Sequence, residues 1–287
     1  MCSEEIAQFQ VEFVVSAVSD VQQPGLKARF KEARRKAIKR FGMRLIRRLR
    51  ETLAKQSLVS NDPVLDAKQF PALDPFVERW EEIQAEVKEI LKHREAVPAF
   101  EEVSPDQMKI AKNKLWRTFI LFGFGTKLEK NCAQAPVTTE LLEKVPNLQT
   151  AWFSIMSPRY HVARHKGVTK SILRAHLGLI IPKDAENCRM RVDNEICVWR
   201  EGEIFVFDDT YDHEVWNDTD DERVILLFDF DRPMRLWGRI INRVFVWALK
   251  FTSYYQTPKK NMKTYEDQFE AATRQADQML EAMSEKG

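Results

Sequence analysis

Residues 152–233 predict an α+β protein with an antiparallel jelly-roll core. The apolar runs of this stretch are short, rich in β-branched and aromatic residues, and separated by turns, as small strands are. The stretches before and after it have helical periodicity, so helical additions are expected at both ends. Strands are expected at 150–157, 171–181, 188–193, 195–200, 203–208, 213–217 and 222–230. A jelly roll buries this many short strands economically.

The N-terminal region, taken as residues 1–110, is predicted to be helical. After a first helix over 4–21, a long basic amphipathic helix is expected, because residues 27–50 hold twelve lysines and arginines and one acid, Glu32, in a chain of net charge +2. Three interpretations of this helix stay open. It docks its apolar stripe on the domain, it contacts an anionic membrane surface, or it binds nucleic acid or another protein.

Further elements precede the β-unit. A second amphipathic helix is expected after Asp74-Pro75, with Phe76, Trp80, Ile83, Val87 and Ile90/Leu91 as its apolar positions. Residues 114–125 read as a buried strand or two. A third helix is expected over 138–145, which opens with a capping pattern.

Behind the β-unit, residues 234–287 are predicted to form a helical extension. Arginines at steps of three and four residues fall on one stripe of its first helix, namely Arg232, Arg235, Arg239 and Arg243. The last thirty or so residues are expected to form an exposed terminal helix.

The remaining composition predicts a cytoplasmic protein with free thiols. The four cysteines have no C-x-x-C spacing, and acidic residues stand where a secretion signal would be positively charged. The longest apolar runs fall short of the roughly 20 residues that a spanning helix needs. A peripheral position at a membrane surface stays open, and no nucleic acid partner is expected for the protein as a whole.

Histidines are concentrated in the β-unit, which contains four of the five in the chain. His165 and His213 lie near its two ends, as metal ligands from adjacent rims would, and imidazole pairs suit iron, zinc, copper and nickel. A pair of purely structural histidines is the alternative. A third carboxylate ligand would be expected two residues after His165, where the chain has Gly167. The nearby acids Asp208, Asp209 and Asp212 lie in a turn that more often provides hydrogen bonds to a loop.

Strand alternation predicts a second polar group. Residues i and i+2 face the same side of a strand, so Arg174 projects with His176, and Ser154 with Met156. An arginine among inward apolar residues implies a buried anion, since an unpaired guanidinium would be costly there. A carboxylate ligand is the natural candidate, and Arg223 can reach the same cavity from another strand.

These residues belong to motifs that resemble a known family. The segments SIMSP, HKG, LRAHLGLIIP, CRMRV and WREGEIFVFDDTYDHEVWND closely resemble the aspartyl/asparaginyl β-hydroxylases, which are Fe(II)- and 2-oxoglutarate-dependent dioxygenases, over roughly residues 115–233. The resemblance implies a double-stranded β-helix (jelly-roll, cupin-like) domain over 111–233. It also implies that His165 and His213 bind iron, and that a glycine at 167 is normal for the family.

The resemblance further implies the cosubstrates and their residues. O2 and 2-oxoglutarate are expected as cosubstrates, with 2-oxoglutarate contacted by Ser154, Met156, Arg174, His176 and Arg223, of which Arg223 is also grouped with the catalytic residues. The expected reaction is hydroxylation of an unactivated C–H bond, on the β-carbon of an aspartyl or asparaginyl residue or on a related amino acid or peptide. Hydroxylation of a lipid A-type acyl chain at the membrane surface is the alternative, and a non-catalytic cupin-like binding module is the alternative from another class.

Overall fold

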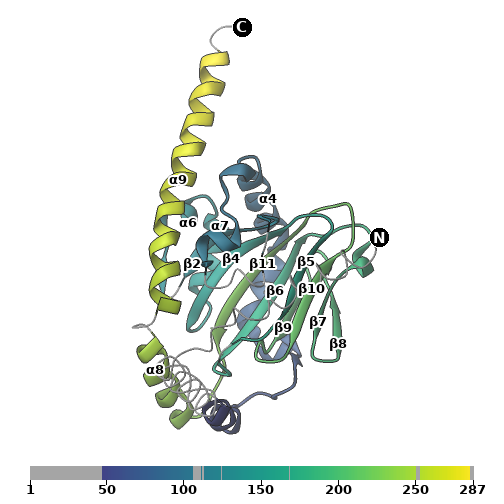
Figure 1. The fold of residues 1–287 in the computed structure, drawn as a ribbon, viewed down its shortest axis with the longest axis vertical. Coiled ribbons are helices and arrows are strands. Elements are labelled where there is room, and N and C mark those ends of the chain that lie inside the picture. Colours follow the sequence, from purple (N-terminus) through teal and green to yellow (C-terminus); the bar gives the residue numbers. More distant parts are fainter. Residues whose placement is uncertain are drawn as a thin grey trace, which may run out of the picture. The chain divides into compact units, whose positions relative to one another are not determined.

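The computed structural model describes residues 47–105, 111, 113–123, 125–167, 169–249 and 253–284. Within the compact unit Arg50–Gly287, two antiparallel sheets form the centre (Figure 1). The larger sheet has seven strands in the order β1-β9-β6-β11-β4-β2-β3, and the smaller has four in the order β5-β10-β7-β8. The strands are β1 Val64–Leu65, β2 Trp116–Gly123, β3 Thr126–Lys127, β4 Leu148–Met156, β5 Tyr160–His165, β6 Ile172–Ile180, β7 Cys188–Val192, β8 Glu195–Val198, β9 Ile204–Phe207, β10 His213–Asn217 and β11 Arg223–Asp231.

The sheets form a jelly roll because, from β4 to β11, the chain crosses from one sheet to the other at every step except the β7–β8 hairpin. An apolar cluster fills the space between the sheets, with Met156 and Ile225 from the larger sheet and Val162 and Met190 from the smaller one. This is the packing expected when two antiparallel sheets bury their inner faces against each other. The predicted fold class, an α+β protein with a double-stranded β-helix core and helical additions, is confirmed.

All seven strands predicted for the β-unit are present, and the strand expected within 114–125 is β2; the prediction missed β5 and the two-residue strands β1 and β3. Strand β5 alternates buried Tyr160 and Val162 with exposed His161, so it follows the period of a half-buried strand. Its polar residues and the absence of an apolar run concealed that period. The omission mattered, because His165 is the last residue of β5.

Several helices differ in detail from the predictions. The single helix expected after Asp74 is two helices, α3 Asp74–Glu78 and α4 Trp80–Leu91, because Arg79 between them has a non-helical φ of −114°. The helix expected over 138–145 is α7 Pro136–Glu143, whose first-turn proline suits a helix start. Short helices α5 Phe100–Val103 and α6 Glu129–Ala133 complete this group. The predicted helix over 4–21 and most of the basic segment 27–50 lie outside the described residues.

Two C-terminal helices follow the sheets, α8 Leu236–Leu249 and α9 Ser253–Ser284. The prediction that the last helix is simply exposed was wrong, because Met262 and Phe269 of α9 are buried. The ring of Phe269 lies edge-on to Phe119 of β2, with centroids 4.8 Å apart. Within the described part of the chain, no helix combines the length and the apolar character that a membrane span requires.

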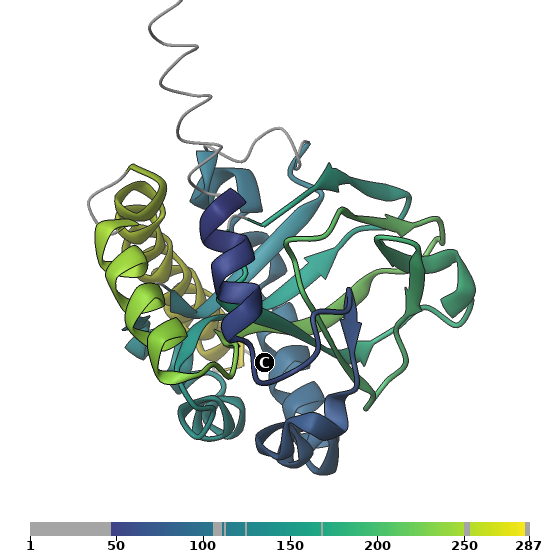
Figure 2. The same cartoon turned by 90° about the horizontal axis from the view of Figure 1, so that it is seen from below.

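The start of α8 is held by residues 50–56, which are helical and lie beside it (Figure 2). The backbone N–H of Arg235 donates to the carbonyl oxygen of Gln56 over 2.9 Å. Arg232, which the sequence placed on the arginine stripe of this helix, precedes α8 and is buried in an ion pair with Asp208. That part of the prediction was wrong, and the stripe begins at Arg235.

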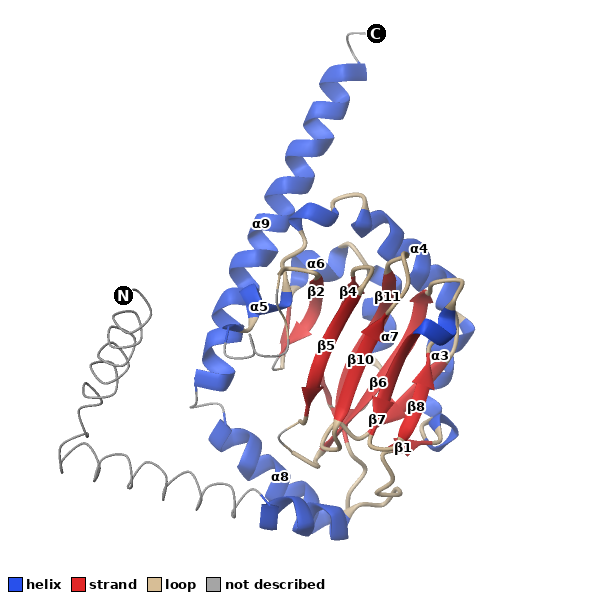
Figure 3. Cartoon of the chain, turned by 45° about the vertical axis from the view of Figure 1, so that its right-hand side comes forward, coloured by secondary structure: helices blue, strands red, loops and turns tan. Residues whose placement is uncertain are grey.

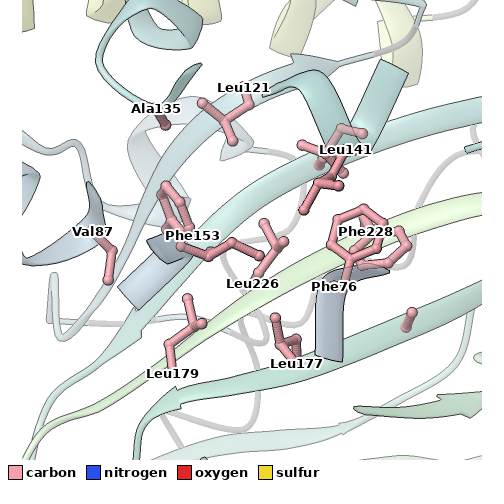
Figure 4. Packing of buried hydrophobic residues seen from close by; sticks show 14 of the residues in the cluster. Phe76, Val87, Leu121, Ala135, Leu141, Phe153, Leu177, Leu179, Leu226 and Phe228 are labelled. Atoms are coloured by element: carbon pink, nitrogen blue, oxygen red, sulfur yellow. The ribbon is translucent and has the colours of Figure 1, made fainter. Parts of the chain in front are cut away.

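Helices α3, α4 and α7 cover the outer face of the larger sheet, while the smaller sheet lies against its inner face (Figure 3). Phe76 of α3 stacks on Phe228 of β11, with ring centroids 4.9 Å apart. Val87 of α4 and Leu141 of α7 belong to the same cluster, as does Phe153 of β4 (Figure 4). The larger sheet is therefore buried on both faces and forms a rigid platform for the polar residues between the sheets.

Candidate active site

His165 and His213, expected to act as a pair, lie side by side in the structure. His165 ends β5 and His213 begins β10, and the antiparallel register sets them opposite each other. Their ring centroids are 4.0 Å apart. Each Nδ1 lies within hydrogen-bonding distance of a backbone carbonyl oxygen two residues earlier, that of Ala163 at 2.8 Å and that of Tyr211 at 3.0 Å. With Nδ1–H donating, each Nε2 keeps its lone pair for another partner.

The environment keeps both imidazoles neutral, as a metal ligand must be. Burial, and next the proximity of His165, lower the pKa of His213 to about 3. Burial likewise lowers the pKa of His165. The Nε2 atom of His213 is buried without a hydrogen-bond partner in the protein, which is uncommon except where a ligand binds.

A carboxylate lies against Gly167, two residues after His165. A Cβ built on Gly167 would lie 2.1 Å from Oδ1 of Asp209, so this carboxylate occupies the space of a side chain at position 167. Two backbone contacts hold the loop, since the Gly167 N–H donates to the Asp209 carbonyl oxygen over 2.7 Å and Arg50 Nη2 donates to the Gly167 carbonyl oxygen over 2.5 Å. The glycine therefore leaves room for a carboxylate that arrives from elsewhere in the chain.

Asp209 departs from the loop role expected for the three acids of this turn. Its two acidic neighbours behave as expected of loop residues, because Asp208 accepts hydrogen bonds from Thr210 and Asp212 pairs with Arg164. Asp209 differs, since its Oδ1 is buried and has no hydrogen-bond partner. Its place four residues before His213, on the same turn, was the available signal.

Burial raises the pKa of Asp209 to about 7, although the nearby positive charge of Arg174 acts in the opposite direction. The closest approach between the two is 3.8 Å, from Arg174 Nη2 to Asp209 Oδ2. A cation next to the histidine pair would favour the ionised carboxylate. Among the described residues, no cluster of three or more His, Cys, Asp or Glu side chains has an arrangement that could hold a metal ion.

The second group of polar residues surrounds Arg223 at the start of β11. Arg223 is buried, its Nη2 donates to Ser154 Oγ over 3.2 Å, and its guanidinium lies 4.8 Å from the ring centroid of Trp199. The same hydroxyl oxygen accepts a hydrogen bond from Trp116 Nε1 over 2.9 Å. Met156 is directly opposite Arg223 in the strand register and is fully buried. Burial lowers the pKa of Arg223 to about 10, as for a cation that lacks an anionic partner.

His176 faces the same interior and leaves both ring nitrogens buried without a partner. Burial and the charges of two arginines lower its pKa well below the ordinary value. Nε of Arg223 and Nε1 of Trp199 are also buried and unpartnered. Several unpartnered donors around one guanidinium indicate a site that an anionic ligand would complete.

Aromatic contacts connect the two groups. The Phe207 ring lies 5.6 Å from His213 and 5.0 Å from His176, centroid to centroid. His176 in turn lies 6.0 Å from Trp199, on which the Arg223 guanidinium rests. The histidine pair and the guanidinium therefore belong to one interior, lined by apolar side chains between them.

Arg174 has a protein partner. Its Nε and Nη2 donate to the two carboxylate oxygens of Asp229 over 2.7 and 2.8 Å, across the β6–β11 register. Thr150 Oγ1 donates to the same carboxylate over 2.8 Å. The buried anion that Arg174 implied is present as Asp229. Its assignment to 2-oxoglutarate stays a prediction, as do those of Ser154, Met156, His176 and Arg223, which surround the second group.

The comparisons with known proteins agree with the motifs. A sequence profile of the family described as aspartyl/asparaginyl beta-hydroxylase matches residues 77–233, which begins earlier than the resemblance over 115–233. The human aspartyl/asparaginyl beta-hydroxylase is 40% identical over 134 residues, covering 45% of this chain and 17% of that protein. Among solved structures, a prolyl-4-hydroxylase from Pseudomonas putida covers 54% of this chain and 88% of that chain, with 18% identity and a TM-score of 0.35.

One relative matches far beyond the catalytic segment. The ornithine lipid ester-linked acyl 2-hydroxylase of Rhizobium tropici is 37% identical over 239 residues, which is 82% of this chain and 84% of that protein. This match extends beyond the jelly roll into the helical additions, because the jelly roll alone is much shorter. The chain belongs to the aspartyl/asparaginyl β-hydroxylase family, and it is a hydroxylase.

Proposed function

We propose that this protein is an Fe(II)- and 2-oxoglutarate-dependent hydroxylase that acts on the acyl chain of a membrane lipid. The paired imidazoles support the metal assignment most directly. Both are neutral, both have Nδ1 engaged by a backbone carbonyl, and Nε2 of His213 is buried without a partner. Neutral imidazole nitrogens suit Fe(II).

The residues around Arg223 fit 2-oxoglutarate, a dianion. Arg223 would pair with the distal carboxylate in a charge-assisted bond, while Ser154 Oγ and the unpartnered nitrogens of His176 provide further polar contacts. Iron, 2-oxoglutarate and O2 together would supply the oxidant that replaces a C–H hydrogen by hydroxyl, with release of succinate and carbon dioxide. The apolar walls formed by Met156, Phe207 and Trp199 would exclude water from the reacting groups.

Asp209 would act beside the two histidines. Its unpartnered Oδ1 could accept a hydrogen bond from a water molecule held at the metal. Gly167 positions this carboxylate by leaving its space open. Arg174, fixed by Asp229, approaches the other oxygen and limits how far Asp209 can turn.

Two observations support a lipid rather than a carboxylate-bearing substrate. The relative named for acyl 2-hydroxylation matches 82% of this chain, whereas the human relative named for aspartyl/asparaginyl hydroxylation matches 45%. In the interior, Arg174 is already paired with Asp229, and 2-oxoglutarate would take Arg223. Neither guanidinium then remains for the carboxylate of an aspartyl substrate, while a neutral hydrocarbon chain needs none.

An aspartyl or asparaginyl side chain in a peptide is the second candidate. The catalytic segment favours it, because the 134 residues shared with the human enzyme are 40% identical.

A single set of incubations tests both candidates. The purified protein is supplied with Fe(II), 2-oxoglutarate and O2, together with either ornithine lipid or a peptide containing Asp and Asn, and succinate and product masses are measured. We expect one added oxygen atom per lipid, matched by succinate, and no product when iron is chelated. Oxygen on the peptide alone would overturn the lipid substrate. Lipid hydroxylation that continues without iron or 2-oxoglutarate would overturn the cofactor assignment.

A further inference from the structure

Helix α8 has one side that is buried against the rest of the protein and an opposite side that is exposed. Gly238 and Asn242 are buried on one side, and a Cβ at Gly238 would lie 2.6 Å from Cβ of Gln56. With about 3.6 residues per turn, the opposite side is apolar across about 100° of arc. That side consists of Leu236, Trp237, Ile240, Val244 and Trp247, each between 43% and 68% exposed. These five residues are called the outer face of α8 below.

Exposed apolar residues are concentrated here. Among the described residues, nine large apolar side chains are exposed, and five of them form the outer face. Leu58, a sixth at 62% exposure, is joined to the start of α8 by the hydrogen bond from its N–H to the Pro233 carbonyl oxygen. Single exposed apolar residues need no explanation, but a contiguous set that includes two tryptophans marks a binding surface.

The charged residues next to this face on α8 are all positive. Arg235, Arg239 and Arg243 are exposed and fall on one arc next to the apolar residues, with no acidic residue anywhere in α8. Within the part of the chain that the structure describes, none of the three forms a salt bridge with a carboxylate. Tryptophan with flanking arginine is the composition of a helix that lies in the boundary layer of an anionic bilayer.

The outer face belongs to the same end of the jelly roll as the histidine pair. His165 ends β5 and His213 begins β10 at the end near which α8 lies (Figure 3). Arg232, just before α8, donates to the Lys170 carbonyl oxygen over 2.9 Å and pairs with Asp208, the neighbour of Asp209. The helix is thus bonded to the turn that forms part of the candidate active site.

We propose that the outer face of α8 and its three arginines are a docking surface for anionic lipid headgroups, which seats the histidine end of the jelly roll on a bilayer. The apolar side chains would enter the boundary layer and the arginines would bind phosphate groups. If the substrate is a lipid, as proposed, docking through this surface would bring the acyl chains to the end of the jelly roll where His165 and His213 lie. In this respect the inference rests on the proposed function.

The test is binding of the full chain to vesicles of phosphatidylcholine with and without phosphatidylglycerol, in the absence of iron and 2-oxoglutarate. We expect sedimentation with the anionic vesicles and little with the neutral ones. A Trp237→Ser/Ile240→Ser/Trp247→Ser variant should bind at least about tenfold more weakly, and so should an Arg235→Gln/Arg239→Gln/Arg243→Gln variant. Ile196→Ser and Arg200→Gln, exposed residues outside α8, are the matched controls and should bind as the unaltered chain does.

A second measurement identifies the surface that inserts, even when residues 1–46 also contribute to binding. Brominated lipids should quench tryptophan fluorescence in the unaltered chain, and a Trp237→Phe/Trp247→Phe variant should keep its binding while losing most of that quenching. Equal quenching in both proteins, or unchanged binding of the serine variant, would overturn the proposal. A dimer in solution that the serine variant dissolves would also overturn it, because a second copy would then cover the face.

Failure of docking and failure of the proposed function give different results. Vesicle binding is measured without turnover, so a protein that docks through α8 but adds no oxygen to lipid contradicts only the substrate. A protein that hydroxylates lipid dispersed in detergent but ignores anionic vesicles contradicts only the docking surface.

Discussion

The two faces of the larger sheet are built from the same strands but differ in composition: the face toward the helices is apolar, and the face toward the smaller sheet carries polar groups. Toward the helices, β4 presents Phe153 and Ile155, and both are fully buried in an apolar cluster with α3, α4 and α7. Toward the smaller sheet, the neighbouring residue Ser154 meets Arg223, and His176 leaves both ring nitrogens without partners. The alternation of the strand separates these faces residue by residue.

The difference shows where the fold gains and loses stability. A buried polar atom without a partner costs about 1–3 kcal/mol, so the inner face weakens the ligand-free protein at several positions. Burial of large apolar side chains on the helix face contributes about 1.5–3 kcal/mol for each residue and offsets this cost. The helix face is therefore expected to govern unfolding, and the inner face ligand binding and turnover.

The strongest test of this division is removal of both imidazoles. A His165→Ala/His213→Ala variant should consume no 2-oxoglutarate, because it removes both of the adjacent imidazoles proposed to hold the iron. Each single variant should need at least about tenfold more Fe(II) for half-maximal succinate production, since one nitrogen ligand is lost. Circular dichroism should show that all three stay folded.

His161 provides the matched control for that experiment. It is also on β5, but its Nε2 lies 2.8 Å from Glu214 on the exposed side of the strand. His161→Ala should retain the iron dependence of the unaltered chain. Normal 2-oxoglutarate consumption by the double variant would place the iron elsewhere.

The next test compares two adjacent residues of β4. Phe153→Ala should lower the free energy of unfolding by about 3–5 kcal/mol, because a fully buried ring is replaced by a cavity. Ser154→Ala should change it far less and should instead raise the Michaelis constant for 2-oxoglutarate. Chemical denaturation and steady-state kinetics of both variants give the comparison. Equal losses of stability would mean that the two faces do not differ as proposed.

Arg223→Leu should weaken the binding of 2-oxoglutarate without lowering the free energy of unfolding. It removes the expected partner of the distal carboxylate, and loss of such a buried charge pair costs about 2–5 kcal/mol, or roughly thirtyfold or more in affinity. The free energy of unfolding of the ligand-free protein should not fall, since the guanidinium is buried with its Nε unpartnered. 2-oxoglutarate should raise the melting temperature of the unaltered chain and not that of the variant. An unchanged affinity would mean that Arg223 does not bind the distal carboxylate.

Gly167→Ala tests how Asp209 is positioned. The new Cβ would collide with the Asp209 carboxylate and displace it from its place beside residue 167. Loss of a supporting group of this kind typically lowers metal affinity or activity by about 10–100-fold. Asp209→Ala should have a similar effect, and the double variant should be no worse than Asp209→Ala, because both changes remove one interaction. Additive losses would mean that the two residues act independently.

The sequence predicted the strands of the β-unit and the inward direction of Ser154, Met156 and His176, because two-residue alternation is local. It also identified His165 and His213 as a pair, although β5, which ends at His165, was missed. Short polar strands such as β5 have too little apolar content to reveal their period.

Contacts set by register between distant strands could not be predicted. Arg174 looked unpaired because its partner, Asp229, is 55 residues away and becomes its neighbour only through the β6–β11 ladder. Asp209 looked like a loop acid because its proximity to Gly167 depends on how two loops meet at the end of the sandwich. The burial of Arg232 has the same origin, since helical spacing assigned it to α8 without its bond to Asp208.

Asp231 gives the smallest expected effect and completes the comparison along β11, where it lies on the same row as Arg223. Burial raises the pKa of its carboxyl to about 6, although Gln149 Nε2 donates to it over 2.8 Å. An unfolded aspartate titrates near about 3.9, so between about pH 4 and pH 6 the folded protein holds a proton that the unfolded chain releases. The contribution of this group to the free energy of unfolding therefore falls as pH rises through that window, by about 1–3 kcal/mol in total.

Asp231→Asn should remove this fall, so the difference in unfolding free energy between variant and unaltered chain should grow in favour of the variant from pH 4 to pH 6.5. Asp212, whose pKa is lowered to about 2 by Arg164, is unaffected by the substitution and cancels in this difference. A difference that stays constant with pH would mean that Asp231 ionises normally and that polar groups on this row are costly only next to the ligand site.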